Sequence, residues 1–491
     1  LNAVDRVAEL YEGRDFTPAW REPARIDALL GLIDDAWADG LDPEDYHRAD
    51  IGRRRLEARS FSPAERASFE LTLTDALISL VHHQRFGKTD PADRHEGREP
   101  PDSDAGSDTL ALVREAIEAP SLRRFLEERI SRGPYYRRLR AALARYRRIA
   151  SEGDWPAIPD GPSLEAGMND RRLPALALRL RLAGDLEEPK ASTHPVEMDA
   201  TLVEAVRRFQ TRHGLTPDGI VGPATLLALN APVEARIQQL RLALERLRWL
   251  SGGLDDMFIA VNIAGFRIYF VADRRILWES RVVVGKAQQQ TPVFRGVVDY
   301  IVFNPSWSVP YSIATREMLP EIKTQPDWFE RNGYEVRDER GARVDPATVD
   351  WSAVTRRTFD YSLVQPPGPA NALGQVKFVF PNRHSVYLHD TPAKQLFSTA
   401  ARAFSHGCIR VENPLELAGI LLGPDGWDRR RIDAAVANGN TSTVFLSRPV
   451  PILLLYSTAT VDPDGTVHFY PDIYRRDAAV ARALDGPFRI P

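Results

Sequence analysis

The chain has 491 residues, which is too long for one ordinary hydrophobic core, so we expect two to four domains. Hydrophobic residues make up 43% and charged residues 27%, a composition that excludes a disordered chain. The formal net charge of −4 gives no basic surface for a polyanion, so nucleic acid is not an expected partner.

The start of the sequence carries no targeting pattern. Leu1 is not an initiator methionine, and no charged segment followed by an apolar stretch comes after it. We therefore expect a mature or trimmed chain, and these residues leave open whether a signal peptide was removed. No apolar run reaches the roughly 18 residues that a bilayer span needs, and Val450–Tyr456 predicts a short buried strand.

Residues 1–165 are predicted to form a helical scaffold domain. Apolar residues recur there at three- and four-residue steps, as at Leu29, Leu30, Ile33 and Trp37, and at Leu71, Leu73, Leu77 and Leu80. A polar stretch, Asp90–Asp108, predicts a long surface loop. Gly and Pro between Ser151 and Asp170 indicate the first domain boundary. His82 and His83 lie on a helical pattern and are interpreted as scaffold residues.

Residues 166–232 are predicted to form a second, smaller helical domain. Leu202, Val206 and Phe209 share one helix face, Gly214 marks the helix end, and Pro223 suits the first position of another helix. The pair Phe209-Gln210, followed by the turn Asp218-Gly-Ile-Val-Gly-Pro223, resembles the three-helix peptidoglycan-binding domain. The resemblance does not decide whether this domain still binds glycan or serves as a spacer.

Residues 256–449 carry short β-branched and aromatic runs that predict a mainly β domain. The predicted strands are Phe258–Ile263, Arg267–Ala272, Ile276–Val284, Val297–Phe303, Val376–Phe380, Ser385–Leu388 and Thr443–Leu446. Residues 306–375 are too many for a plain loop and predict an inserted capping subdomain, whose aromatic side chains we expect to form a small core. Residues 450–491 are expected to pack on the scaffold or on the β domain. The predicted fold class is therefore multidomain α+β.

Cys408 is the single cysteine of the sequence, so no intramolecular disulfide can form. It lies in the run Ser405-His-Gly-Cys-Ile-Arg-Val411. A thiol attacks as the thiolate, and a histidine in hydrogen-bond reach can take its proton and later return it to a leaving amine. His389 ends a predicted strand 19 positions before Cys408 and is the candidate for that role.

The residues around Cys408 predict an exposed turn. Gly407 would let the N–H groups of Gly407 and Cys408 point at a developing oxyanion. Asn413 and Pro414 then predict a helix cap and the first residue of a helix. The thiol is thus expected on a glycine-bearing turn ahead of a helix.

The motif Ser-His-Gly-Cys, followed by an aliphatic residue and Arg, has a histidine upstream, and fifteen residues separate that histidine, His389, from the serine, Ser405. It resembles the YkuD-type L,D-transpeptidase catalytic domain. The wider chain resembles the large Gram-negative YcbB-type enzymes, which have a helical scaffold, a peptidoglycan-binding domain and a capped catalytic domain. The run from Trp307 to Pro320 fits the cap of that type.

This resemblance implies the following roles. Cys408 is the nucleophile and His389 the general base and acid; His406 and Gly407 shape the turn and the oxyanion hole; Arg410, Ser405 and Tyr387 contact the substrate. It also implies no metal or other cofactor, peptidoglycan stem tetrapeptides as donor and acceptor, carbapenems as inhibitors, other cell-wall enzymes as partners, and a periplasmic location.

Several alternatives stay open. In some relatives a Gly or Ser follows the catalytic histidine and its carbonyl orients the ring; with Asp390 here, either the backbone or the carboxylate could do so. His406 could be structural or catalytic. His384, more simply a surface-loop residue, could join His389, His406 and Cys408 on zinc, although no zinc-binding spacing is present. The chain could also be a non-catalytic wall-binding scaffold. With water or a protein amine as acceptor, the same site would serve an L,D-carboxypeptidase or a lipoprotein-anchoring enzyme.

Overall fold

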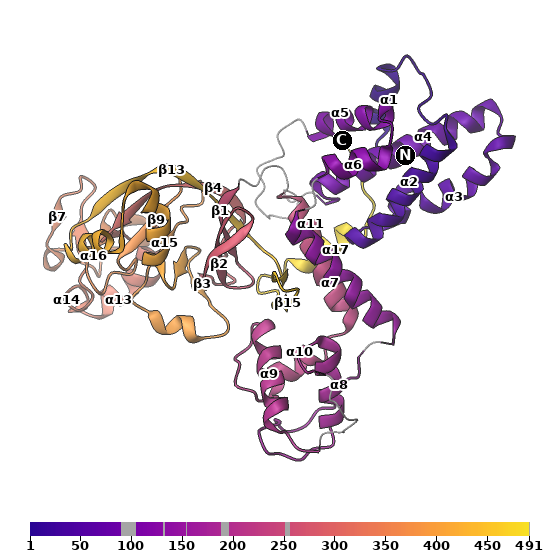
Figure 1. Ribbon diagram of the computed structural model, residues 1–491. Coiled ribbons are helices and arrows are strands. Elements are labelled where there is room, and N and C mark those ends of the chain that lie inside the picture. Colours follow the sequence, from indigo (N-terminus) through magenta and orange to yellow (C-terminus); the bar gives the residue numbers. More distant parts are fainter. Residues whose placement is uncertain (90–104, 131–132, 154, 188–195, 251–255, 491) are drawn as a thin grey trace. The chain divides into compact units, whose positions relative to one another are not determined.

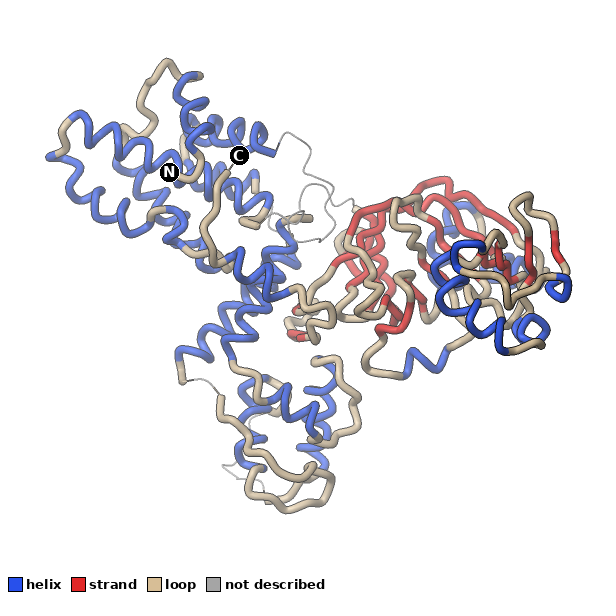
Figure 2. Tube along the Cα trace, turned by 180° about the vertical axis from the view of Figure 1, so that it is seen from behind, coloured by secondary structure: helices blue, strands red, loops and turns tan. Residues whose placement is uncertain are grey.

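The computed structural model describes residues 1–89, 105–130, 133–153, 155–187, 196–250 and 256–490. It divides the chain into two compact units, one of Leu1–Leu254 with Leu455–Pro491 and one of Asp255–Leu454 (Figure 1). The first is mainly helical and the second is built around a β-sheet, as the helix and strand colours of Figure 2 show. The predicted multidomain α+β fold class is confirmed. None of the described helices has both the length and the apolar character needed to cross a membrane.

Helices of the first unit enclose one large apolar core. Leu29, Ile33, Leu73 and Leu77 are buried in it, as their helical spacing predicts. Leu71 and Trp37 share that spacing but are exposed. The helices around this core are α1 Val4–Glu12, α2 Pro23–Ala36, α3 Arg48–Glu57, α4 Pro63–Phe86, α5 Ala105–Glu118, α6 Leu122–Arg129, α11 Val233–Arg248 and α17 Asp477–Leu484. Helix α7 Pro134–Ser151 packs with α11 in a separate apolar cluster.

The predicted surface loop and the C-terminal segment both bear on the extent of the first unit. Of the predicted loop Asp90–Asp108, residues 90–104 lie outside the described residues, and residues 105–108 already belong to α5. The C-terminal segment joins the scaffold core through Val480, Leu484 and Ile490. The chain end is therefore part of the first unit, together with its short strands β14 Ala459–Val461 and β15 Val467–Phe469.

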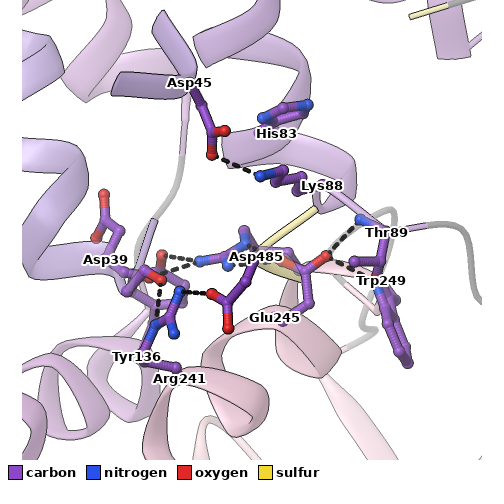
Figure 3. A network of polar contacts seen from close by, with 12 residues as sticks. Asp39, Asp45, His83, Lys88, Thr89, Tyr136, Arg241, Glu245, Trp249 and Asp485 are labelled. Atoms are coloured by element: carbon purple, nitrogen blue, oxygen red, sulfur yellow. Dashed lines mark hydrogen bonds and ion pairs between the residues drawn. The ribbon is translucent and has the colours of Figure 1, made fainter. Parts of the chain in front are cut away.

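A buried polar network fastens the end of α4 to α11 (Figure 3). Glu245 on α11 is fully buried and accepts hydrogen bonds from the backbone N–H and the hydroxyl of Thr89, at 2.7 and 3.0 Å. Its other oxygen accepts from Arg248 at 2.6 Å, so the buried charge is paired. Arg241, also on α11, binds Asp485 at 2.7 Å and so ties the C-terminal segment to the same helix.

The second helical domain contains α8 Leu173–Ala183, α9 Ala200–Arg212 and α10 Pro223–Leu229. Phe209 is fully buried in its core with Leu202 and Val206. The side-chain amide of Gln210 donates to Asp218 at 2.8 Å and its oxygen accepts from the N–H of Gly219 at 2.8 Å. Gln210 of the Phe-Gln pair therefore holds the Asp-Gly turn against helix α9.

The second unit is built on a nine-stranded sheet of order β11-β3-β12-β10-β9-β4-β13-β1-β2, in which β2 pairs back with β3. The sheet thus closes on itself and has few free edges. Its strands are β1 Met257–Asn262, β2 Arg267–Ala272, β3 Arg275–Gly285, β4 Phe294–Phe303, β9 Val376–Val379, β10 Leu388–His389, β11 Ala403–Ser405, β12 Ile409–Val411 and β13 Ser442–Leu455. Helices α15 Pro414–Leu422 and α16 Arg429–Ala437 lie between β12 and β13.

Two strands differ from the sequence-based expectation. The runs predicted at Thr443–Leu446 and Val450–Tyr456 form one strand, β13, with a register shift between Phe445 and Val450. Residues 450–454 therefore belong to the sheet, beyond the predicted domain end at 449. The predicted strand Ser385–Leu388 shrinks to β10, because Ser385 has φ = 54° and the Asn382 side chain holds a turn there.

Residues 306–375 hold a small second core. A four-stranded sheet of order β5-β8-β6-β7 packs with short helices around Trp328. Trp307, Phe329, Tyr334, Trp351 and Tyr361 pack against this cluster, as expected of a small core, whereas Tyr311 is exposed. The elements are β5 Trp307–Ser308, α12 Tyr311–Ile313, a π-helix Ala314–Met318, α13 Leu319–Thr324, α14 Trp328–Asn332, β6 Glu335–Arg337, β7 Arg343–Val344 and β8 Ser362–Gln365.

Candidate active site

Cys408 lies on the tight turn between β11 and β12. Gly407 has φ = 116°, a conformation that a residue with a side chain rarely adopts. The Ser405 hydroxyl donates to the carbonyl of Cys408 at 2.5 Å and accepts from the N–H of Gly407 at 3.1 Å. The Thr291 hydroxyl donates to the carbonyl of Gly407 at 2.8 Å. The turn that carries the thiol is therefore fixed from both sides.

These bonds correct two sequence-based expectations. The N–H of Gly407 is occupied by Ser405, so it does not join Cys408 in facing an oxyanion in this structure. Among the described hydrogen bonds, the N–H of Cys408 has no acceptor in the protein and is the amide left for that role. The side chain of Ser405 is 2% exposed and both its bonds lie inside the turn, so it shapes the turn and offers no surface to a substrate. Asn413 precedes α15 without a side-chain cap, although Pro414 begins the helix as predicted.

His389 is held by backbone rather than by a carboxylate. Its Nδ1 lies 2.5 Å from the carbonyl oxygen of Asp390, which can only accept, so Nδ1 carries the proton and Nε2 is the free base. The Asp390 carboxylate points elsewhere: it accepts from the N–H of Gln375 at 2.9 Å and pairs with Lys394. The backbone carbonyl of Asp390, and not its carboxylate, therefore orients the ring of His389.

The site rests in its neutral form. Burial lowers the pKa of His389 to about 3, with further lowering by the positive charges of Arg410 and Lys377. Burial raises the pKa of the Cys408 thiol, an effect that contacts with the backbone and side chain of Tyr387 partly offset. No hydrogen bond joins the thiol to His389; the thiol lies 3.8 Å from the carbonyl oxygen of Ser385. Proton transfer to Nε2 must therefore accompany substrate binding rather than precede it.

Three side chains stand in a row across the sheet face beside the thiol. In the ladder, His389 on β10 pairs directly with Arg410 on β12 and with Lys377 on β9. Residues directly opposite each other on neighbouring strands project to the same face. The ring of Tyr387 lies 3.8 Å below the Lys377 ammonium, and its hydroxyl meets Cys408. Burial raises the pKa of Tyr387, so it stays a hydrogen-bond donor at neutral pH.

Sequence reasoning did not single out Lys377 or Thr291. Lys377 is half-buried within the run Val-Lys-Phe-Val of β9, and a charged residue inside a buried strand was the available signal. The sequence gives no comparable signal for Thr291, because its role depends on a loop that returns to Gly285. The N–H of Gly285 donates to the hydroxyl of Thr291 at 2.9 Å.

The predicted residues His406 and His384 stand apart from His389. Nε2 of His406 lies 2.7 Å from a carboxylate oxygen of Glu317, which belongs to the inserted segment. His384 is exposed on a turn, with its ring 5.0 Å from that of Phe294. Trp307, also of the inserted segment, hydrogen-bonds Tyr387. The insertion therefore contacts the thiol-bearing region at two points. In the part of the chain that the structure describes, no three His, Cys, Asp or Glu side chains group closely enough to hold a metal ion.

Known families match three stretches of the chain. Residues 256–452 match the L,D-transpeptidase catalytic domain of the YkuD family. Residues 5–143 match a scaffold domain, and residues 180–229 match a family described as "Putative peptidoglycan binding domain".

Similar proteins were found among curated sequences and solved structures. A Haemophilus influenzae protein called "Putative L,D-transpeptidase" is 35% identical over 243 residues, which are 50% of this chain and 49% of that protein. The match thus spans about half the length of the relative. An L,D-transpeptidase from Mycobacterium smegmatis aligns at 14% identity and a TM-score of 0.19, over 41% of this chain and 58% of that one. An L,D-transpeptidase from Stackebrandtia nassauensis aligns at 11% identity and a TM-score of 0.23, over 61% of this chain and 96% of that one.

The family matches agree with the chemistry of the site: a lone thiol on a rigid glycine turn, and a neutral histidine whose proton position is fixed. Residues 256–452 are an L,D-transpeptidase catalytic domain of the YkuD family, carried in a chain that also contains a scaffold domain and a domain of the peptidoglycan-binding type.

Proposed function

We propose that this protein is an L,D-transpeptidase that joins two peptidoglycan stem peptides. The observation that carries the proposal is the fixed tautomer of His389, which presents a free Nε2 on the strand next to the turn of Cys408. The proposed cross-link connects two diaminopimelate residues, and the terminal D-alanine of the donor is released.

In the proposed first step, Nε2 of His389 takes the thiol proton as the sulfur of Cys408 attacks the carbonyl at the L-centre of the donor diaminopimelate. A carbon–sulfur bond forms and an oxyanion develops, toward which the N–H of Cys408 is available. Collapse breaks the carbon–nitrogen bond, and His389 returns the proton to the departing D-alanine. In the second step the amine of another stem peptide attacks the thioester and gives a proton to His389. The carbon–sulfur bond then breaks, and His389 returns the proton to the sulfur of Cys408, which regenerates the thiol.

The inserted segment is proposed to act as a cap over this site. Its Glu317 and Trp307 contact His406 and Tyr387, on either side of the turn of Cys408. A thioester that waits for a second peptide is exposed to competing water, and a cap that covers it would favour transfer over hydrolysis. The predicted bounds of the cap, 306–375, belong to this proposal.

The match to a peptidoglycan-binding domain supports a cell-wall location for the proposed enzyme. The peptidoglycan-binding type of domain supports a peptidoglycan partner. We infer a periplasmic location in a Gram-negative cell, with stem tetrapeptides as donor and acceptor, carbapenems as inhibitors and other cell-wall enzymes as further partners.

Product analysis of muropeptides tests the proposal. Incubation with stem tetrapeptides should yield cross-linked dimers and free D-alanine, and Cys408→Ala should lower both by roughly 10³-fold or more. Matched circular dichroism spectra would show that the variant is folded. Undiminished D-alanine release by Cys408→Ala would refute the proposal. Release without dimers would identify an L,D-carboxypeptidase, and transfer only to a protein amine would identify a lipoprotein-anchoring enzyme.

A further inference from the structure

Among the described residues, no carboxylate pairs with Lys377 or Arg410, the two cations beside the thiol. No described hydrogen bond or ion pair involves the ammonium of Lys377 or the guanidinium of Arg410, and Nε of Arg410 is buried without a partner. The ammonium of Lys377 lies 3.8 Å from the centre of the Tyr387 ring. Both residues are half-buried, and burial lowers the pKa of each. Buried cations without a partner are costly, which makes such a pair a candidate binding site.

The carboxylates of Asp390 and Glu317, in the region around the thiol, have other partners. Asp390 is used by Lys394 and by the N–H of Gln375, and Glu317 is used by His406. Once Cys408 is ionised, its thiolate is the opposite charge that acts on both Lys377 and Arg410 and raises their pKa. Two positive charges therefore face the reacting atom, and a bound anion would complete the site.

The spacing indicates where on a substrate that anion lies. Neighbouring strands are about 4.8 Å apart, so Lys377 and Arg410 flank His389 at about that distance on each side. Arg410 is two residues beyond Cys408 along the chain, about 6.6 Å for an extended segment. An anion held here lies close to the carbonyl under attack. In a peptide cut at its last bond, the terminal carboxylate is three covalent bonds from that carbonyl carbon.

We propose that Lys377 and Arg410 form a carboxylate-binding subsite for the free C-terminus of the amino acid that Cys408 expels. Arg410 offers a planar donor pair and Lys377 a point charge, a combination that suits a carboxylate. The inference rests on the proposed transpeptidase function. It extends that function by assigning the requirement for a free donor C-terminus to two named side chains.

The first test needs no turnover. Iodoacetate and iodoacetamide differ by one negative charge, and with one cysteine in the chain both report on Cys408 alone. The ratio of their rates cancels changes in thiol pKa, because both reagents react with the same thiolate. We expect Lys377→Met and Arg410→Met each to lower the iodoacetate-to-iodoacetamide ratio by about 5-fold or more at low salt, with Lys377→Arg restoring it.

Arg429→Met is the matched control, since it removes a positive charge from an exposed ion pair on α16 of the same unit and should leave the ratio unchanged. Added salt should lower the parent ratio toward that of the variants. If Arg410→Met does not fold, the rate ratios of Lys377→Met and Lys377→Arg still test the subsite. A Lys377→Met ratio equal to that of the parent overturns the subsite.

The second test uses two donor tetrapeptides, one with a free C-terminal carboxylate and one with a C-terminal amide. The parent enzyme should prefer the free acid by roughly 10-fold or more, mainly through a lower KM, and Lys377→Met should lose most of that preference. Equal rates with both peptides in the parent would overturn the subsite and leave the transpeptidase proposal intact. No product from either peptide would refute the transpeptidase proposal, while the alkylation ratio would still report on the two cations.

Discussion

Glu317 of the inserted segment and His406, two residues before Cys408, face each other with 2.7 Å between a carboxylate oxygen and Nε2. Both side chains are part-exposed, so their pairing contributes modestly to stability, at most about 1 kcal/mol. Its position gives it more weight. Glu317 lies on the π-helix Ala314–Met318, a deformation that often marks functional sites.

We expect Glu317→Gln to loosen the cap without unfolding the protein. The ratio of hydrolysed to cross-linked product should rise by roughly 2- to 10-fold, because water gains access to the thioester. Muropeptide analysis by mass spectrometry measures the ratio. Glu330→Gln, on an exposed position of α14, is the matched control. An unchanged ratio in Glu317→Gln would leave the contact a purely structural one.

The alkylation of Cys408 should keep rising with pH through the neutral range. Burial raises the pKa of the thiol. As long as the pH is below that pKa, raising it by one unit increases the thiolate fraction about tenfold. Iodoacetamide rates from pH 6 to pH 10 on the resting enzyme would measure this. A plateau already at pH 7 would mean that a thiolate–imidazolium pair exists at rest, contrary to the neutral pair described above.

His389 should make the second unit less stable in acid. Its pKa is lowered to about 3 in the folded state against about 6.5 in an unfolded chain. The unfolded state therefore binds a proton first as the pH falls. The contribution of His389 to the free energy of unfolding is complete above about pH 6.5. As the pH falls from there to about pH 3, it declines by about 1.4 kcal/mol per pH unit. Urea midpoints of the parent should fall more steeply between pH 6 and pH 4 than those of His389→Gln, and parallel curves would contradict the assignment.

The roles of Asp390 and His389 should separate on mutation. The carbonyl of Asp390 orients the histidine ring, so Asp390→Asn keeps that contact, whereas it loses the ion pair with Lys394 and changes the group that accepts from the N–H of Gln375. We expect Asp390→Asn to lower turnover by less than about 10-fold, and His389→Ala by roughly 10³-fold or more. Steady-state rates of D-alanine release compare them. Equal losses would mean that the carboxylate itself takes part in catalysis.

A carbapenem should label the chain once. The single thiol is Cys408, so intact mass should rise by one drug mass, and prior treatment with iodoacetamide should prevent the rise. Cys408→Ala is the control. An adduct that persists in this variant would place the reaction on another residue.

The sequence alone determined the local structure and the chemical type of the site. Helical spacing at Leu29, Ile33, Leu73 and Leu77 predicts buried faces because side chains three and four apart share a side of a helix. The run from Phe209 and Gln210 to the Asp218-Gly219 turn identifies the second helical domain, because Gln210 holds that turn against the helix. The motif at Ser405–Cys408 with His389 upstream indicates the nucleophile and its base, since few residue types can supply that chemistry.

Tertiary structure decided which side chains lie side by side and which atoms of each residue form the contacts. Strand pairing places Lys377 and Arg410 beside His389, and no local pattern contains the register between strands. The choice of the Asp390 carbonyl over its carboxylate follows from Gln375 and Lys394, which capture the carboxylate. The N–H of Gly407 is taken by Ser405 because of the exact path of the turn. These are relations of geometry between side chains, and they exist only once the sheet has closed.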